Sequence, residues 1–221
     1  MKKFAIILLI ISLNIYGQKK VLDHKDFDIW NRIQNSQISS NGEFIMYSLQ
    51  RGEEDSFLKI KDKNANLIFE HDRAEKGVFS YNSKYAIFAI KEWNDTITEM
   101  KRRKVKKEKM PMDSIGIFNL QNKTLVKISN IKSYKNPEKW SGYLAYTYDL
   151  TNKQKKDTIK QKKINKKPSS KNGYPLIIRN LDTEKEDTIP FVLDYTFSKE
   201  EKFISYAVSY THLTLPTIRT V

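Results

Sequence analysis

Hydrophobic and polar residues alternate with a period of two in short runs along most of the chain, and polar turns rich in Asn, Ser, Lys and Gly bound these runs. This alternation is typical of β-strands that bury one face, whereas an amphipathic helix repeats about every 3.6 residues. The segment 92–110 is the one stretch that we expect to be helical within the folded part. The pattern therefore predicts a protein built almost entirely from short strands.

One motif recurs along the chain, in which an apolar residue and a Ser lead through a polar turn into an alternating apolar strand. Its copies are 38–47, 79–88 and 197–206, and a shortened copy lies at 140–146. The first two turns contain Asn41-Gly42 and Asn82-Ser83. The motif predicts a turn followed by an inner strand of a sheet.

A second motif alternates with the first at 58–62, 115–119 and 176–180, and each copy precedes a polar tetrad, at 63–66, 121–124 and 182–185. Such tetrads suit tight turns between antiparallel strands. Two motifs in a fixed alternating order indicate a repeating unit of several strands.

Repeats of about 40 to 50 residues with roughly four strands each indicate a β-propeller, and the longer periods here reflect insertions. We therefore predict an all-β fold, a β-propeller fragment with about three four-stranded antiparallel blades plus the start of a fourth. The blades are expected at 38–70, 79–128 and 140–190, with the next starting at 197–207, inside a partial propeller domain of 18–207. A β-sandwich with as many strands is the alternative, but it does not predict the alternating motifs.

The chain begins with Met1-Lys2-Lys3, an apolar run at 4–13 and a small residue at Gly17. This arrangement predicts a helical signal peptide at 1–17 and a periplasmic or extracellular protein with no stable membrane insertion after cleavage. A signal anchor is the alternative, although the run is shorter than the ~20 residues that span a bilayer. The absence of Cys fits an oxidising compartment.

The last residues differ in composition from the Lys- and Glu-rich chain before them. The segment 208–217 is Thr-rich and free of charged residues, and it resembles the conceptual translation of a sequencing adaptor. We therefore expect 208–221, His212 included, to be a non-native tail, and the native chain to continue past about Ala207. A genuine edge strand is the alternative.

The net charge of +14 raises the possibility of nucleic-acid binding. Two segments, 101–109 and 153–171, hold a positive excess equal to that whole net charge, and neither contains an aromatic residue for base stacking. We therefore interpret them as solvated basic insertions between strands, with no nucleic acid as partner. Contact with an anionic membrane or envelope surface stays open.

Candidate catalytic chemistry is sparse. The sequence has no Cys, no G-x-S-x-G nucleophile elbow, no Gly-rich phosphate loop and no H-E-x-x-H zinc motif. His24 and His71 are expected at the surface, and the acidic pairs Glu53-Glu54 and Glu200-Glu201 are expected in solvent. We therefore predict no catalytic residue, no cofactor-binding residue and no metal ligand in this chain.

The three Trp residues are the remaining candidates for binding. Trp30, Trp93 and Trp140 have the size and chemistry to line a peptide-binding surface. Trp140 stands where a blade strand starts, so we expect it in the core instead.

The segment 27–33 before 38–42, the Lys-rich insertion that leads into 110–117, and the blade motifs together resemble the N-terminal part of bacterial prolyl-oligopeptidase-family (S9) serine peptidases. The resemblance covers 19–207, although Asn41 and Asn82 replace the commoner Asp. It implies a secreted parent enzyme whose α/β-hydrolase domain, missing from this chain, cleaves peptides while the propeller covers the active site. The implied partners are peptide substrates and that hydrolase domain. A non-enzymatic periplasmic or surface propeller that binds a ligand is the alternative.

Overall fold

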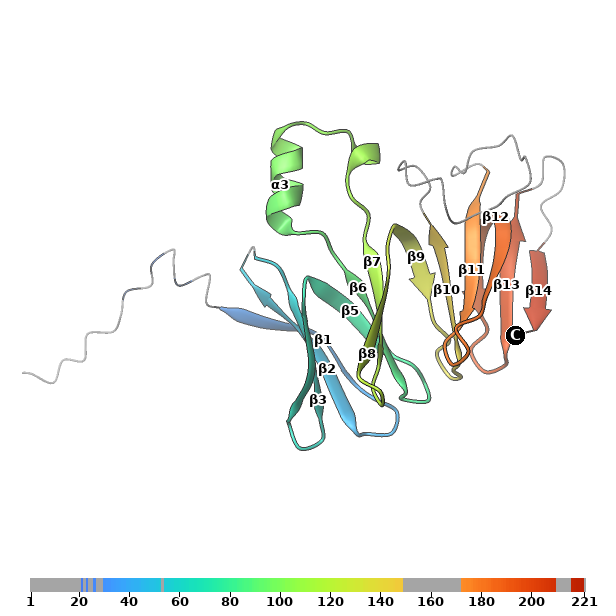
Figure 1. Ribbon diagram of the computed structural model, residues 1–221, viewed down its shortest axis with the longest axis horizontal. Coiled ribbons are helices and arrows are strands. Elements are labelled where there is room, and N and C mark those ends of the chain that lie inside the picture. Colours follow the sequence, from blue (N-terminus) through green and yellow to red (C-terminus); the bar gives the residue numbers. More distant parts are fainter. Residues whose placement is uncertain are drawn as a thin grey trace, which may run out of the picture.

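The computed structural model describes residues 21, 23, 26, 30–52, 54–148, 172–209 and 216–220 of the chain. Nearly all of them lie in strands or in the turns between strands (Figure 1). In chain order the strands are β1 (Asn31–Ile38), β2 (Phe44–Arg51), β3 (Phe57–Asp62), β4 (Leu67–Asp72), β5 (Ala74–Phe79), β6 (Tyr85–Ile90), β7 (Ser114–Asn119), β8 (Thr124–Ile128), β9 (Ile131–Lys135), β10 (Tyr143–Tyr148), β11 (Tyr174–Asn180), β12 (Glu186–Phe197), β13 (Phe203–Val208) and β14 (Pro216–Thr220).

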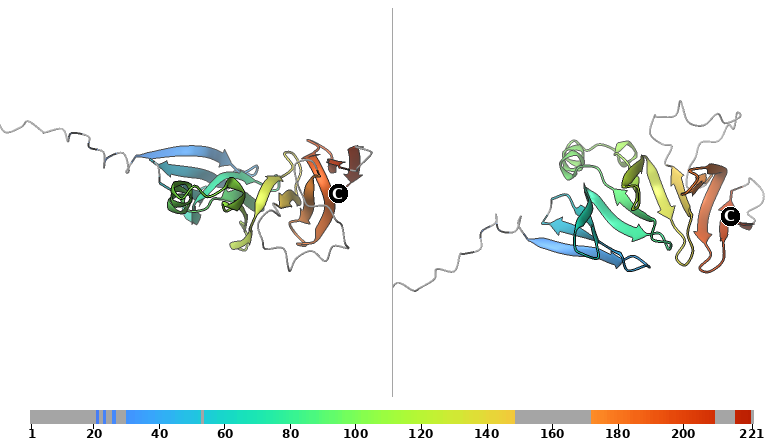
Figure 2. Two further views of the ribbon diagram at one scale, coloured as in Figure 1. Left: turned by 90° about the horizontal axis from the view of Figure 1, so that it is seen from above. Right: turned by 60° about the horizontal axis from the view of Figure 1, so that its bottom comes forward.

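The strands form three antiparallel sheets that stand side by side (Figures 1 and 2). The first contains β1 to β4, the second β5 to β8, and the third runs from β9 to β14, each in sequence order. Each sheet is a meander whose neighbouring strands follow one another in the chain, as in propeller blades. The prediction of an all-β fold made of antiparallel propeller blades is confirmed.

The third sheet combines one blade with the start of another. The first half of β12 pairs with β11, where Ile177 faces Thr188, and the second half pairs with β13, where Tyr195 faces Tyr206. Both ends of β12 lie at the same end of the sheets, so the strand turns back near Phe191, which adopts a φ of 59°. Here the fourth strand of the third blade continues directly into the first strand of the fourth.

Each sheet begins one strand before the start of the corresponding predicted blade. The strands β1, β5 and β9 precede the Ser-containing turns, and the strands after those turns, β2, β6 and β10, are inner strands as predicted. The expected helix is present as α3 (Asn94–Arg102), followed by the 3-10 helix η1 (Lys107–Lys109). No helix among the described residues is long and apolar enough to cross a membrane.

Three apolar cores lie between consecutive blades, and the period-two alternation divides the residues of each strand among them. In β6, Ala86 and Phe88 pack toward the first sheet, while Tyr85 and Ile87 pack toward the third. Large, fully buried side chains of the three cores are Met46, Leu58, Ile60 and Phe88 in the first, Ile87, Ile115, Leu144 and Tyr146 in the second, and Leu176, Val192 and Ile204 in the third. Each blade is therefore stabilised by its neighbours.

Close packing in the second sheet requires a glycine. A Cβ atom on Gly116 of β7 would lie 2.3 Å from Cε2 of Phe88 on β6. The absence of a side chain at Gly116 lets the Phe88 ring lie across β7, and Phe88 is fully buried there.

The first motif is explained by a hydrogen-bonded turn. The Ser80 hydroxyl donates to Asn82 Oδ1 (2.8 Å) and accepts from the Tyr85 backbone N–H (3.0 Å). Ser39 does the same with Asn41 and Phe44. The position after each Asn has a positive φ, 73° at Gly42 and 55° at Ser83.

Three predicted segments lie partly or wholly outside the described residues. These are the signal peptide at 1–17, the basic segment 153–171 and residues 210–215 and 221 of the tail. They stay predictions, as does the expectation of export.

Candidate functional site: a polar cavity between two blades

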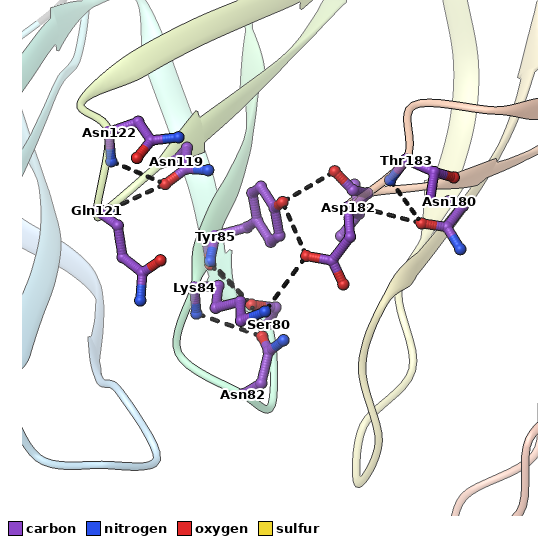
Figure 3. A network of polar contacts seen from close by, with 11 residues as sticks. Ser80, Asn82, Lys84, Tyr85, Asn119, Gln121, Asn122, Asn180, Asp182 and Thr183 are labelled. Atoms are coloured by element: carbon purple, nitrogen blue, oxygen red, sulfur yellow. Dashed lines mark hydrogen bonds and ion pairs between the residues drawn. The ribbon is translucent and has the colours of Figure 1, made fainter.

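A polar cavity of about 310 Å³ lies between the second and third sheets, at the end where the hairpins β7–β8 and β11–β12 turn (Figure 3). Its lining comes from β6, β7, β8 and β11, from those two hairpins and from the turn between β5 and β6. The lining residues are Lys84, Tyr85, Ile117, Asn119, Gln121, Asn122, Thr124, Val126, Arg179, Leu181, Asp182 and Glu184. The turn motifs of two different blades therefore meet in one site.

Tyr85 forms one wall of the cavity and connects the two blades. The Ser80 turn fixes its backbone at the start of β6, and its side chain reaches the β11–β12 hairpin. The Tyr85 hydroxyl donates to the Leu181 carbonyl oxygen at 2.9 Å and lies 3.1 Å from Asp182 Oδ1. Burial, with the Asp182 carboxylate nearby, raises the pKa of Tyr85 to about 12. The hydroxyl therefore stays protonated at neutral pH and serves as a hydrogen-bond donor.

An ion pair beside Tyr85 also links the blades. Lys84 Nζ lies 3.4 Å from Asp182 Oδ1. Asp182 is held in place because the Asn180 side-chain oxygen accepts from the backbone N–H groups of Asp182 and Thr183, each at 3.0 Å. The second motif thus presents Asp182 toward the first motif of the preceding blade (Figure 3).

Arg179 adds a second positively charged side chain, beside Lys84, to the lining of the cavity. Its side chain is 12% exposed and bonds Glu186 Oε1 at 2.6 Å and Glu184 Oε2 at 3.2 Å. The Tyr146 hydroxyl donates to the same Glu186 oxygen at 2.7 Å. Burial and this hydrogen bond raise the pKa of Tyr146. Arg179 is therefore fixed in position by acceptors from its own sheet.

Three amide side chains line the opposite wall. Asn119 uses its side-chain oxygen to accept from the backbone N–H groups of Gln121 and Asn122, at 2.9 and 3.0 Å. The Gln121 and Asn122 side-chain amides make no hydrogen bond with the residues that the structure describes. Each offers both a donor and an acceptor to a molecule in the cavity.

This arrangement is suited to binding a small polar molecule, because it combines amide groups, paired charges of both signs and a fixed Tyr donor. It does not place an imidazole beside a hydroxyl nucleophile. Among the described residues no three His, Asp or Glu side chains gather in a way that would hold a metal ion. Its chemistry makes the cavity a candidate binding site.

The expectation for His71 is wrong. Its side chain is 9% exposed rather than at the surface. The ring lies near those of Phe69 and Phe88, because His71 pairs with the buried Leu58 across β3 and β4. Burial lowers the pKa of His71. The other two histidines, His24 and His212, lie outside the described residues.

The structure places the Trp residues in three separate parts of the molecule. Trp30, before β1, is 52% exposed, and Trp93, before α3, is 45% exposed. Trp140 is buried as predicted, and its indole N–H donates to the Ser198 carbonyl oxygen at 3.0 Å. The three residues therefore do not form one peptide-binding surface.

The acidic pairs are in part described. Glu200 is exposed and forms an ion pair with Lys139 at 2.6 Å, which agrees with the expectation of a solvated turn. Glu201 is also exposed, whereas Glu53 lies outside the described residues.

The cavity residues could not be predicted from the sequence. Lys84, Tyr85 and Asp182 belong to motif copies that were recognised, but Tyr85 and Asp182 lie 97 residues apart. The available signal was that Asn119 and Asn180 end equivalent strands, so their hairpins lie at the same end of adjacent blades. Nothing in the local pattern identifies which side chains of these hairpins meet.

Comparison with known proteins supports the propeller architecture. No family model matches the sequence, and no curated protein sequence matches it. Among solved structures, the chain is similar to a prolyl endopeptidase, with 11% identity and a TM-score of 0.51 over 83% of this chain and 27% of that one. At this identity the similarity shows the fold alone.

Two further similar structures are a β-propeller domain of a protease and a peptidase. The β-propeller domain of the Trilobed protease from Pyrococcus furiosus shows 14% identity and a TM-score of 0.48, over 86% of this chain and 54% of that domain. The acylaminoacyl peptidase of Pyrococcus horikoshii shows 12% identity and a TM-score of 0.48, over 91% of this chain and 33% of that enzyme. The chain thus spans about half of the propeller domain and a third or less of the two whole peptidases.

Proposed function

We propose that this chain is the N-terminal propeller portion of a secreted S9-family serine peptidase. In this proposal the parent hydrolyses peptides with an α/β-hydrolase domain encoded downstream, and the propeller limits which substrates reach it. The observation that carries the proposal is the blade architecture, which is similar to that of a prolyl endopeptidase. The residue-level resemblance at 27–33, 38–42 and 110–117 adds independent support.

The reading frame of the intact gene tests this proposal directly. We expect sequencing across the codons for Ala207 to Val221 to reveal further blades and then a G-x-S-x-G segment. Expression of that full frame should give peptide hydrolysis, which replacement of the Ser in that segment by Ala should abolish. A native stop codon after Val221, or a full-length protein that lacks the segment, would refute the peptidase assignment.

The polar cavity favours a second candidate function, a propeller that binds a small polar ligand without catalysis. The cavity presents the Gln121 and Asn122 amides beside the Lys84–Asp182 ion pair. We expect such a ligand to be a short peptide or another molecule rich in hydrogen-bonding groups. Calorimetric titration of the chain and of its Gln121→Ala variant with a dipeptide mixture tests this candidate, because only a cavity ligand loses affinity in the variant.

A further inference from the structure

The connection between β6 and β7 projects from the end of the sheets opposite the polar cavity (Figure 1). We call residues 91–113 the basic arm; it contains α3 and η1. The arm is anchored at its base, where Lys91 Nζ lies 2.6 Å from Asp113 Oδ2 and the Asn94 backbone N–H donates to Asp55 at 3.0 Å. The projection is therefore an ordered part of the second blade.

The arm concentrates positive charge at its exposed tip. Its cations are Lys101, Arg102, Arg103, Lys104, Lys106, Lys107 and Lys109, and all seven are exposed. Glu99 pairs with Arg102 at 3.5 Å and with Arg103 at 2.7 Å. The five lysines form no ion pair with the residues that the structure describes. The tip therefore carries charge that its own fold does not neutralise.

Apolar side chains accompany this charge. No residue of α3 is buried. Ile97 and Met100 are three residues apart, which places them on one face of the helix, whereas Trp93, the residue before the helix, stacks against the Arg73 guanidinium with 4.2 Å to the ring centroid. Val105 and Met110, on the return segment of the arm, are also partly exposed. The helix therefore has an apolar face that does not enter any of the three blade cores.

We propose that the basic arm binds the surface of a membrane rich in anionic lipid. Lysines at the tip match the negative potential of such a surface, and a partly exposed aliphatic face fits the boundary between headgroups and acyl chains. Nucleic acid fits less well, because the run 101–109 has no aromatic side chain to stack on bases. The arm lies along the surface without crossing it.

Vesicle flotation tests this inference with the whole chain, since aggregated protein does not float with lipid. Vesicles contain either phosphatidylcholine alone or equal parts of phosphatidylcholine and phosphatidylglycerol. We expect flotation with the mixed vesicles only, and release by added salt, because the attraction between exposed charges is screened. Flotation with both vesicle types would indicate binding through the apolar N-terminal run and would overturn the proposal.

Matched variants locate the binding surface. Replacing Lys104, Lys106, Lys107 and Lys109 by Gln should weaken binding to mixed vesicles at least about tenfold. Replacing Lys123, Lys185, Lys199 and Lys202 by Gln removes the same charge from hairpins at the opposite end, and should change binding by less than about twofold. Equal losses in both variants would show a net-charge effect and contradict a specific role of the arm.

The apolar face has its own test. The Ile97→Ser, Met100→Ser double variant should bind mixed vesicles about fivefold more weakly with an unchanged melting temperature, because neither side chain enters a blade core. Unchanged binding in this variant would remove the amphipathic part of the proposal. Binding to duplex DNA without binding to mixed vesicles would replace the membrane with nucleic acid as the partner. None of these outcomes depends on whether the parent is a peptidase.

Discussion

Tyr85 connects the second and third blades through a single hydroxyl group. The residue is 8% exposed and belongs to the core between these blades, while its hydroxyl lies against Leu181 and Asp182 of the next blade. An apolar residue at this position would satisfy the packing but not these acceptors. The site thus depends on one polar atom at the edge of an apolar core.

We expect Tyr85→Phe to lower the free energy of unfolding by about 1–2 kcal/mol, because the buried Leu181 carbonyl loses its donor. The control is Tyr81→Phe in the same turn, where the side chain is 50% exposed. That change should lie within about 0.5 kcal/mol of the parent chain. Urea denaturation of both variants measures the difference, and equal values would show that the inter-blade hydrogen bond does not contribute.

The buried His71 side chain leads to a prediction about how the stability of the fold depends on pH. Burial lowers its pKa from the ordinary 6.5, so the unfolded chain binds a proton more readily than the folded chain. Stability contributed by the neutral ring is therefore present above pH 6.5 and is lost as the pH falls through 6.5 toward the lower folded-state pKa.

We expect the melting temperature to fall on acidification from pH of about 7.5 to about 5.5, and to fall less in His71→Phe, which cannot gain a proton. His24 and His212 are present in both proteins, so their contributions cancel in the comparison. Parallel melting curves across this range would contradict the assignment of the pH dependence to His71.

At the scale of strands and turns, a hydrogen-bonded Ser-containing turn precedes three of the inner strands, β2, β6 and β13. Ser39, Ser80 and Ser198 each donate a backbone N–H to the carbonyl of the residue five positions on, at 2.9, 2.9 and 3.0 Å. The hydroxyls differ in burial, since Ser80 is 3% exposed and the Ser198 hydroxyl contacts lie at an exposed turn.

Ser80→Ala should therefore lower the free energy of unfolding by about 1–3 kcal/mol, because it leaves the buried Tyr85 N–H without its acceptor. Ser198→Ala removes the equivalent group where water can replace it, and should cost less than about 1 kcal/mol. Chemical denaturation of the two variants provides the measurement. A larger loss in Ser198→Ala would contradict the role given to burial.

The sequence predicts those elements whose geometry is local. The Ser80 turn, the Asn119 and Asn180 hairpins and the helix α3 depend on residues within a few positions of one another, so residue type alone identifies them. The strands β1 and β9 were not predicted, because apolar residues do not alternate regularly in their sequences, NRIQNSQI and IKSYK. Their backbone pairing with β2 and β10 defines them as strands.

Contacts between distant segments could not be predicted in the same way. His71 was expected at the surface because no candidate nucleophile motif lies near it, but the register of β4 against Leu58 turns it toward the first core. The cavity needs Tyr85 and Asp182 to meet across two blades. Inter-blade packing decides both positions, and no local pattern encodes that packing.

At the scale of the whole molecule, each inner strand of a blade has one face toward the preceding blade and one face toward the following blade. Phe88 of β6, Tyr146 of β10 and Ile204 of β13 lie on the face toward the preceding blade, and each is fully buried. In the first sheet, Ile45 of β2 lies on the corresponding face and is 40% exposed. Ile38, its partner across β1 and β2, is 68% exposed.

This exposed face leads to a prediction about association. Apolar blade faces are covered by a neighbouring blade elsewhere in the molecule, so an uncovered one should bind another apolar blade face in solution. We therefore expect the isolated chain to self-associate as its concentration rises, which sedimentation velocity measures. Ile45→Lys should raise the dissociation constant about tenfold, because association would bury an unpaired charge.

The control for this experiment is Tyr81→Lys, which adds the same charge at an exposed turn and should leave association unchanged. Both variants should keep the melting behaviour of the parent chain, because Ile45 and Tyr81 are partly exposed and their replacement opens no cavity in the three cores. A parent chain that stays monomeric at all concentrations and melts cooperatively would contradict the prediction. Equal association of the parent and Ile45→Lys would locate the contact elsewhere, and the free edge of β1 would then be the surface to test, because an unpaired strand edge is itself a template for pairing.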